Sequence, residues 1–182
     1  MANFSTWILN KAGWKVDINV PDYPKAIICV APHTSNWDFL MGELAIRSVG
    51  RHAGFMMKSS WFFFPLGFFL KAIGGIPVNR GKKKGSLVEE MVERFKNSDR
   101  LVVAIAPEGT RKRTTNWHTG FLRIAHEARV PVCLGAIDYR MKKIQIRDIF
   151  ETTGDIAADL RYVKNFYRPF SGRYPEKFST DD

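Results

Sequence analysis

Residues 101–111 read LVVAIAPEGTR, an apolar run that leads directly into a short polar segment. An unbroken run of this kind is typical of a strand that is buried on both faces of a sheet. Polar residues placed directly after such a strand lie at the edge of an α/β sheet where ligands usually bind. This stretch therefore predicts both an α/β fold and the place of its functional site.

The rest of the chain alternates between predicted strands and predicted helices. Apolar runs predict strands at Ala26–Ala31, Phe55–Met57, Ile76–Val78, Leu101–Ala106 and Val132–Ile137. Helical spacing predicts helices at Trp37–Val49, Ser86–Asn97 and Gly120–Ala128, with a last helix from Gly154 to about Phe166. Lys142–Phe150 alternates in part and is predicted to be an edge strand. We therefore expect an α/β fold, a single layered domain with a mostly buried central sheet flanked by helices.

The length of 182 residues suits one domain, which we divide into three segments. Residues 21–170 form the functional domain, and residues 171–182 are expected to be an irregular tail because they are polar and rich in helix breakers. Residues 1–20 carry Phe4, Trp7 and Lys11, which favours an interfacial amphipathic segment. Packing of these side chains against the domain's own core remains the alternative.

A second aromatic segment, Trp61–Leu70, reads WFFFPLGFFL and lies between Lys58 and Lys71. It is too short to cross a bilayer, because a spanning helix needs about 20 predominantly apolar residues. Its density of aromatic residues favours contact with an acyl chain or a membrane surface over simple core packing.

Positive charge is the strongest compositional signal. The chain has 28 Lys and Arg against 18 Asp and Glu, which gives a formal net charge of +10. Such an excess points to nucleic acid, an anionic membrane surface or a phosphorylated substrate. Between Lys71 and Arg113 there are 11 basic and 5 acidic residues, so more than half of the excess surrounds the polar loops. This distribution favours a substrate phosphate and a membrane surface, and no nucleic-acid partner is expected.

Several common chemistries have no signature in the sequence. There is no nucleotide-binding glycine motif of either usual kind and no GxSxG nucleophile elbow. Cys29 and Cys133 each stand in an apolar run, which is typical of small core residues in a reducing compartment. We expect no metal site and no bound cofactor.

The loop after the first predicted strand reads PHTSNWD and contains His33 and Asp38. A turn into the following helix would let the Asp38 carboxylate reach one imidazole nitrogen and leave the other as a base. Alternatively, Asp38 only favours the helix dipole and His33 is a surface residue.

Two further loops carry candidate binding residues. In PEGTR, Arg111 can bind a phosphate with two hydrogen bonds, and Glu108 can hold a hydroxyl group or pair with an arginine. In GGIPVNRGKKKG, residues 74–85, Arg80 is the favoured phosphate ligand, while the lysines are more typical of a solvated turn. We expect the three loops to converge at one edge of the sheet.

Taken in order, these segments resemble the glycerolipid acyltransferase family. His33 and Asp38 resemble its HxxxxD motif, and its other three motifs resemble GGIPVNR (74–80), PEGTR (107–111) and VPVCLG (130–135). His118 stands where the family usually has a more basic residue.

The resemblance implies an O-acyltransferase that moves an acyl chain from acyl-CoA or acyl carrier protein to the free hydroxyl of 1-acyl-sn-glycerol-3-phosphate. It implies His33 as general base, Asp38 as the residue that orients it, and an acyltransferase domain at residues 21–170. The acceptor's phosphate and glycerol would contact a set of five residues: Arg80, Glu108, Gly109, Thr110 and Arg111.

The expected location is the cytoplasmic face of the membrane, as a peripheral protein. Two other readings stay open. The acceptor could be another lysophospholipid or a lyso-aminolipid, or the chain could be a noncatalytic basic protein that binds membranes or nucleic acid.

Overall fold

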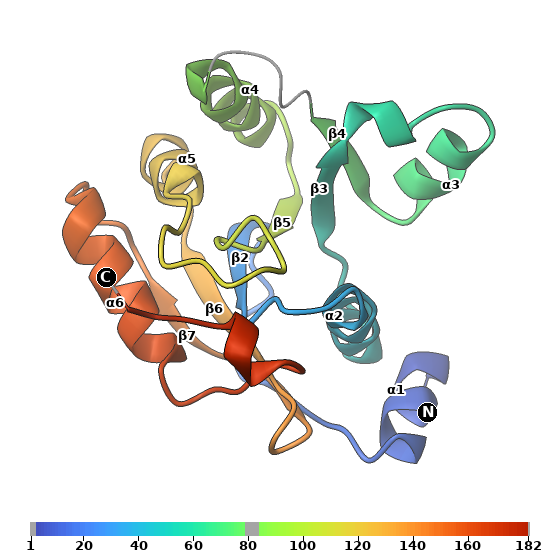
Figure 1. The fold of residues 1–182 in the computed structure, drawn as a ribbon. Coiled ribbons are helices and arrows are strands. Elements are labelled where there is room, and N and C mark those ends of the chain that lie inside the picture. Colours follow the sequence, from blue (N-terminus) through green and yellow to red (C-terminus); the bar gives the residue numbers. More distant parts are fainter. Residues whose placement is uncertain (1–2, 79–83, 182) are drawn as a thin grey trace.

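A seven-stranded sheet runs through the middle of the computed structural model, which describes residues 3–78 and 84–181 (Figure 1). Its strand order is β1-β7-β6-β2-β5-β3-β4, and every neighbouring pair is parallel except β6 and β7. The strands are β1 (Lys15–Ile18), β2 (Lys25–Ala31), β3 (Gly54–Lys58), β4 (Gly75–Val78), β5 (Leu101–Ile105), β6 (Val132–Asp138) and β7 (Lys143–Phe150).

Helices cover both faces of this sheet. They are α1 (Phe4–Lys11), α2 (Trp37–Ser48), α3 (Leu66–Ala72), α4 (Lys84–Lys96), α5 (Gly120–Ala128) and α6 (Ile156–Tyr167), with short 3₁₀ turns at Ser59–Trp61 and Pro175–Lys177. Side chains of α4, α5 and α6 share one core cluster, whereas α1 and α2 share another. The predicted α/β layered fold is therefore confirmed. Within the described residues, no helix is long and apolar enough to span a membrane.

The central strand β2 shows why both faces need cover. Ile27 and Cys29 are fully buried in the cluster with α4, α5 and α6, while Ala26 and Ile28 are buried on the opposite side. Because successive side chains of a strand point to opposite faces, a strand that is apolar throughout is stable only between two layers. Cys29 and Cys133 are both buried, as predicted, and burial raises the pKa of Cys133 to about 11.

The prediction of an edge strand at Lys142–Phe150 is wrong, because β7 lies between β6 and β1. The edge on this side of the sheet is formed by β1, which lies within the first 20 residues and pairs with β7 in parallel. The polar positions that suggested an exposed edge are matched across this pair, since Lys143 Nζ lies 2.8 Å from Asp17 Oδ2. The sequence pattern also gives no indication of α3, which begins within the aromatic run and ends at Ala72.

A buried hydroxyl group on α6 forms hydrogen bonds with the sheet. The Tyr167 hydroxyl lies 2.6 Å from the Cys29 carbonyl oxygen and 3.1 Å from the Gly135 carbonyl oxygen. Gly135 adjoins a register irregularity in β6, and such irregularities interrupt the regular ladder of hydrogen bonds. The tyrosine therefore supplies a donor where the β6 ladder is interrupted.

We predict that Tyr167→Phe lowers the free energy of unfolding by at least about 1 kcal/mol, because two buried carbonyl groups lose a donor. Urea denaturation followed by circular dichroism measures the change. Tyr162→Phe on the same helix is the matched control, because its hydroxyl group binds Asp148 at the exposed surface. Equal effects of the two substitutions would contradict the prediction.

Candidate active site

Two of the three polar loops meet at the carboxyl edge of the sheet. Strands β2 and β5 are parallel neighbours, so the loops that follow them start side by side. The backbone N–H of His33 donates to Glu108 Oε2 at 2.8 Å, and Arg111 Nη1 donates to Asn36 Oδ1. Strand β4 ends at the same edge, but Arg80 and the rest of residues 79–83 lie outside the described residues.

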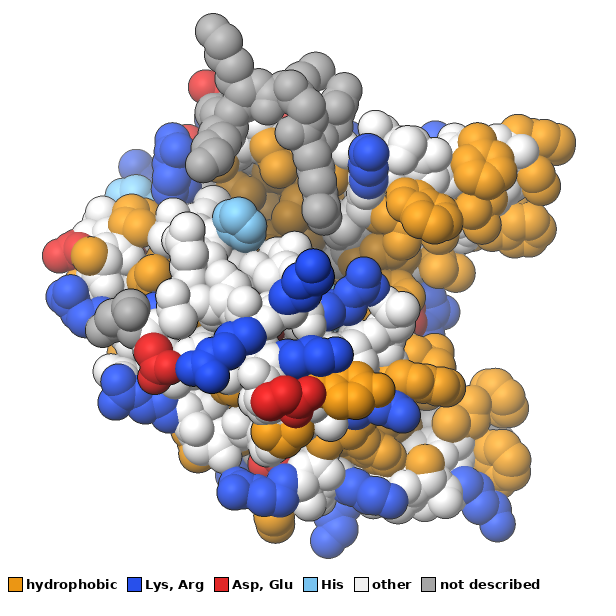
Figure 2. Space-filling model, viewed as in Figure 1, with side chains coloured by type: hydrophobic (Ala, Val, Ile, Leu, Met, Phe, Trp, Pro, Cys, Tyr) orange, Lys and Arg blue, Asp and Glu red, His pale blue; other side chains and the backbone are white. Residues whose placement is uncertain are grey.

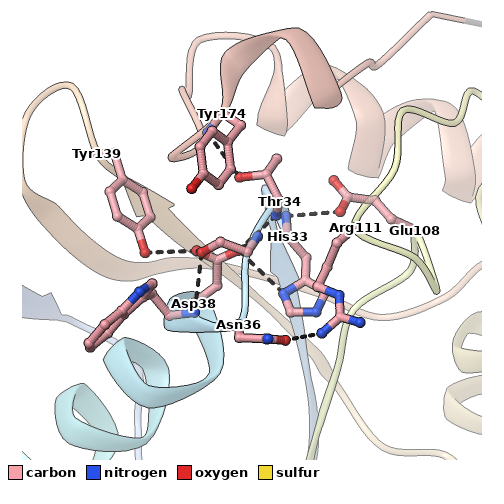
Figure 3. A network of polar contacts seen from close by, with 10 residues as sticks. His33, Thr34, Asn36, Asp38, Glu108, Arg111, Tyr139 and Tyr174 are labelled. Atoms are coloured by element: carbon pink, nitrogen blue, oxygen red, sulfur yellow. Dashed lines mark hydrogen bonds and ion pairs between the residues drawn. The ribbon is translucent and has the colours of Figure 1, made fainter.

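Asp38 carries a buried carboxylate in this site and is 2% exposed (Figure 3). Oδ2 accepts from the backbone N–H groups of Thr34 and Ser35, both at 2.7 Å. Oδ1 accepts from the Ser35 hydroxyl at 2.9 Å and from the Tyr139 hydroxyl at 2.8 Å. Burial by itself would raise the pKa of Asp38, but hydrogen bonds from His33, Ser35 and Tyr139 outweigh burial and lower that pKa. Asp38 is therefore ionised at neutral pH.

The His33 ring faces this carboxylate with one nitrogen. Nδ1 lies 3.4 Å from Asp38 Oδ2, and the His33 side chain is 25% exposed. Because the ionised Asp38 can only accept, it favours a proton on Nδ1 in the neutral imidazole and leaves Nε2 as a base. The structure thus brings together the two residues that were predicted as a pair, although Asp38 also stands in the first turn of α2.

Glu108 contacts the His33 turn and is 4% exposed. Its Oε1 atom is buried and has no hydrogen-bond partner. Burial raises the pKa of Glu108 to about 8, the hydrogen bond from the His33 backbone opposes the shift, and the charge of Asp38 adds to it. Among the described residues, no arginine forms an ion pair with Glu108, so the alternative of a structural ion pair finds no support there.

The rest of PEGTR turns toward the surface. Gly109 has a positive φ of 63°, a backbone conformation that favours glycine, and a Cβ atom there would meet the His118 ring. The Thr110 hydroxyl accepts from the backbone N–H of Lys112 at 3.2 Å. Arg111 is exposed, which leaves most of its guanidinium donors available to a ligand.

Sequence reasoning missed Tyr139 and the segment after α6. The backbone N–H of Tyr139 donates to the Ser171 carbonyl at 2.9 Å, and the backbone N–H of Tyr174 donates to Thr34 Oγ1 at 3.2 Å. The chain after α6 therefore braces the turn that holds Asp38. Tyr139 directly follows β6, which is parallel to β2, so the edge rule that located the other loops could have found it.

A model of the acyltransferase family matches residues 16–137 of this chain, a range that contains every predicted site residue and ends before Tyr139. Among solved structures, the chain is similar to the 1-acyl-sn-glycerophosphate (LPA) acyltransferase PlsC from Thermotoga maritima, with a TM-score of 0.57. The sequence identity is 19%, and the likeness covers 93% of this chain and 79% of that one. At this identity it shows a shared fold. The search among curated proteins finds no match.

The raised pKa of Glu108 predicts a pH-dependent loss of stability. The pKa of Glu108 is about 8 in the folded protein, against a usual value of 4.5. At a pH between these two values, the folded protein therefore holds a proton that the unfolded chain releases. Stability therefore falls as pH rises through this window. We predict that Glu108→Gln removes this loss. The Tm of the variant minus the Tm of the parent should therefore increase from pH 5 to pH 8.

Thermal unfolding at several pH values measures this difference. Glu151→Gln, at an exposed glutamate, is the control and should give a difference that does not change with pH. A constant difference for Glu108→Gln as well would contradict the assignment of a raised pKa.

Proposed function

This chain belongs to the acyltransferase family, and we propose that it transfers an acyl chain from a thioester to the free hydroxyl of 1-acyl-sn-glycerol-3-phosphate, which yields phosphatidic acid. The observation that carries the proposal is the His33–Asp38 pair at the carboxyl edge of the sheet. Asp38 is buried and held by donors from three residues besides His33. An orienting carboxylate of this kind, with a partly exposed imidazole beside it, suits the activation of an alcohol.

In the proposed reaction, His33 Nε2 removes the proton from the acceptor hydroxyl as its oxygen attacks the thioester carbonyl. The ionised Asp38 stabilises the imidazolium that forms. Collapse of the tetrahedral intermediate breaks the carbon–sulfur bond, and the imidazolium proton passes to the departing thiolate. General base catalysis typically contributes about 10²–10⁴-fold, and positioning of the two substrates contributes further.

The acceptor's phosphate is the proposed ligand of Arg111, together with Arg80 from the loop after β4. Arg111 supports this role because its guanidinium is exposed next to the His33 turn. Gly109 and Thr110 would approach the glycerol through their backbone. Glu108 supports the site differently, since its buried carboxyl group holds the His33 backbone in place.

The proposed acyl donor is acyl-CoA or an acyl carrier protein, and the proposed location is the cytoplasmic face of the membrane. Both the acceptor and the product of this reaction are membrane lipids, and the net charge of +10 favours an anionic surface. A protein bound peripherally would reach its acceptor without leaving that surface.

The proposed function is tested by the release of thiol from an acyl thioester in the presence of two acceptors that differ only in the phosphate group. We predict turnover with the phosphate-bearing acceptor and at least tenfold less without it. His33→Ala should lower turnover by about 10²-fold or more, because the alcohol loses its base. His52→Ala, at an exposed histidine, is the control.

Each outcome of this experiment is informative. Equal turnover of both acceptors would favour another lysophospholipid or a lyso-aminolipid as the acceptor. Full activity of folded His33→Ala would overturn the mechanism. No turnover, together with salt-sensitive binding to nucleic acid, would favour the noncatalytic alternative.

Tyr139 is a proposed positioning residue that acts through Asp38. We predict that Tyr139→Phe lowers kcat about three- to tenfold and leaves KM nearly unchanged, because Asp38 loses one donor that fixes its orientation while the surface that binds substrate stays intact. Tyr162→Phe, which removes an exposed hydroxyl contact, is the control. A rise in KM at constant kcat would contradict the positioning role.

A further inference from the structure

Exposed hydrophobic side chains gather on one side of the molecule. They lie on α1, on α2 and between residues 61 and 73, and we call them the aromatic surface: Phe4, Trp7, Trp37, Leu40, Trp61, Phe63, Phe64, Phe68 and Phe69. Figure 2 shows hydrophobic side chains gathered over α3 and over α1, with a hollow between the two groups. Soluble monomeric proteins rarely leave a large apolar patch without a partner.

The first part of this surface is the segment that contains α3. Phe64 is 91% exposed and Phe68 is 74% exposed. A Cβ atom at Gly67 would lie 2.6 Å from the Phe62 backbone, so α3 is folded tightly against the chain that precedes it. Phe64 and Phe68 are thus exposed on a segment that is tightly folded.

The second part is helix α1. Phe4, Trp7 and Lys11 are spaced so that they share one face of the helix, and the rings of Phe4 and Trp7 stack with centroids 6.1 Å apart. Leu9 is buried in the cluster that α1 shares with α2. Only one side of α1 therefore packs against the core, and the aromatic side of the helix faces away from it.

Helix α2 connects the two parts to the candidate active site. Its first residue, Trp37, is exposed, and so is Leu40 one turn later. Asp38 lies between them in the sequence and points into the protein, toward His33. The aromatic surface therefore reaches the place where the proposed chemistry occurs.

We propose that the aromatic surface docks on an anionic phospholipid bilayer, with the α3 segment and α1 entering the interface on either side of α2. Tryptophan and other aromatic side chains favour the boundary between headgroups and acyl chains. Exposed lysines accompany both parts: Lys11 and Lys15 lie at α1, Lys58 lies just before residues 61–73, and Lys71 lies in the last turn of α3. This combination of rings and cations fits an anionic bilayer better than the surface of another protein.

The inference rests on the proposed function only where it explains what docking would achieve. A docked protein would hold His33 at the depth of lipid headgroups, which is where the free hydroxyl of a lysophospholipid lies. The acceptor could then reach His33 with its acyl chain still in the bilayer. The docking itself does not require that the chemistry is correct.

Sedimentation of the 182-residue chain with vesicles tests the docking. We expect binding to phosphatidylcholine vesicles that contain phosphatidylglycerol, and at least tenfold weaker binding for the double variant Phe64→Ser/Phe68→Ser. Met141→Ser and Tyr162→Ser are matched controls, because both side chains are exposed but lie outside the aromatic surface. Equal binding by the double variant and the controls would overturn the proposal.

A charge variant keeps the test decisive if the double variant does not fold. Lys58→Glu/Lys71→Glu changes two exposed side chains and should weaken binding to the anionic vesicles by at least tenfold. Tight binding of the parent to vesicles of phosphatidylcholine alone would overturn the role of charge. A dimer that depends on Phe64 and Phe68, without vesicle binding, would show that the surface pairs with a second copy instead.

Turnover separates this inference from the proposed function. With a short-chain acceptor that stays monomeric in solution, we expect Phe64→Ser/Phe68→Ser to match the parent, whereas with the acceptor embedded in vesicles it should lose at least tenfold. Equal turnover of the embedded acceptor by variant and parent would count against docking. If vesicle binding depends on these residues but no acceptor is turned over, docking stands and the proposed function fails.

Discussion

The buried carboxylate of Asp38 is the constraint on which the site depends. A charge that is removed from water must be matched by donors, and otherwise it costs several kcal/mol. The donors to Asp38 come from the turn after β2 and from Tyr139 after β6, and the chain after α6 braces both through Ser171 and Tyr174. A network of hydrogen bonds around this charge therefore connects the sheet edge, the turn and the C-terminal segment.

Glu108 complements this arrangement because its carboxyl group stays protonated and uncharged at neutral pH. Burial is the main cause of the raised pKa of Glu108, and the charge of Asp38 adds to it. Asp38 keeps its charge because it has donors at both oxygens, whereas Glu108 Oε1 has none. As a result the site presents one negative charge to His33, and Glu108 still accepts from the His33 backbone.

Local signals predicted most of the fold, and interactions between distant segments explain what was missed. Apolar runs such as LVVAIA located the strands because burial on both faces leaves a pattern within one segment. The inner position of β7 depends on β1, more than a hundred residues earlier, and neither segment reveals that pairing alone. In the site, His33 and Asp38 could be paired from their spacing, whereas Tyr139 reaches Asp38 only through the folded sheet.

Helix α2 links the chemistry to the aromatic surface by its periodicity. Asp38, Met41 and Ala45 follow one another at helical spacing and are buried, while Trp37 and Leu40 fall on the exposed side. Because a helix turns as a rigid unit, a rotation that buried Trp37 or Leu40 in the protein would also carry Asp38 away from His33. The geometry that orients the imidazole therefore keeps the apolar side chains of Trp37 and Leu40 exposed at the same end of α2. A bilayer that covers this stripe would remove its cost in water without disturbing the carboxylate behind it.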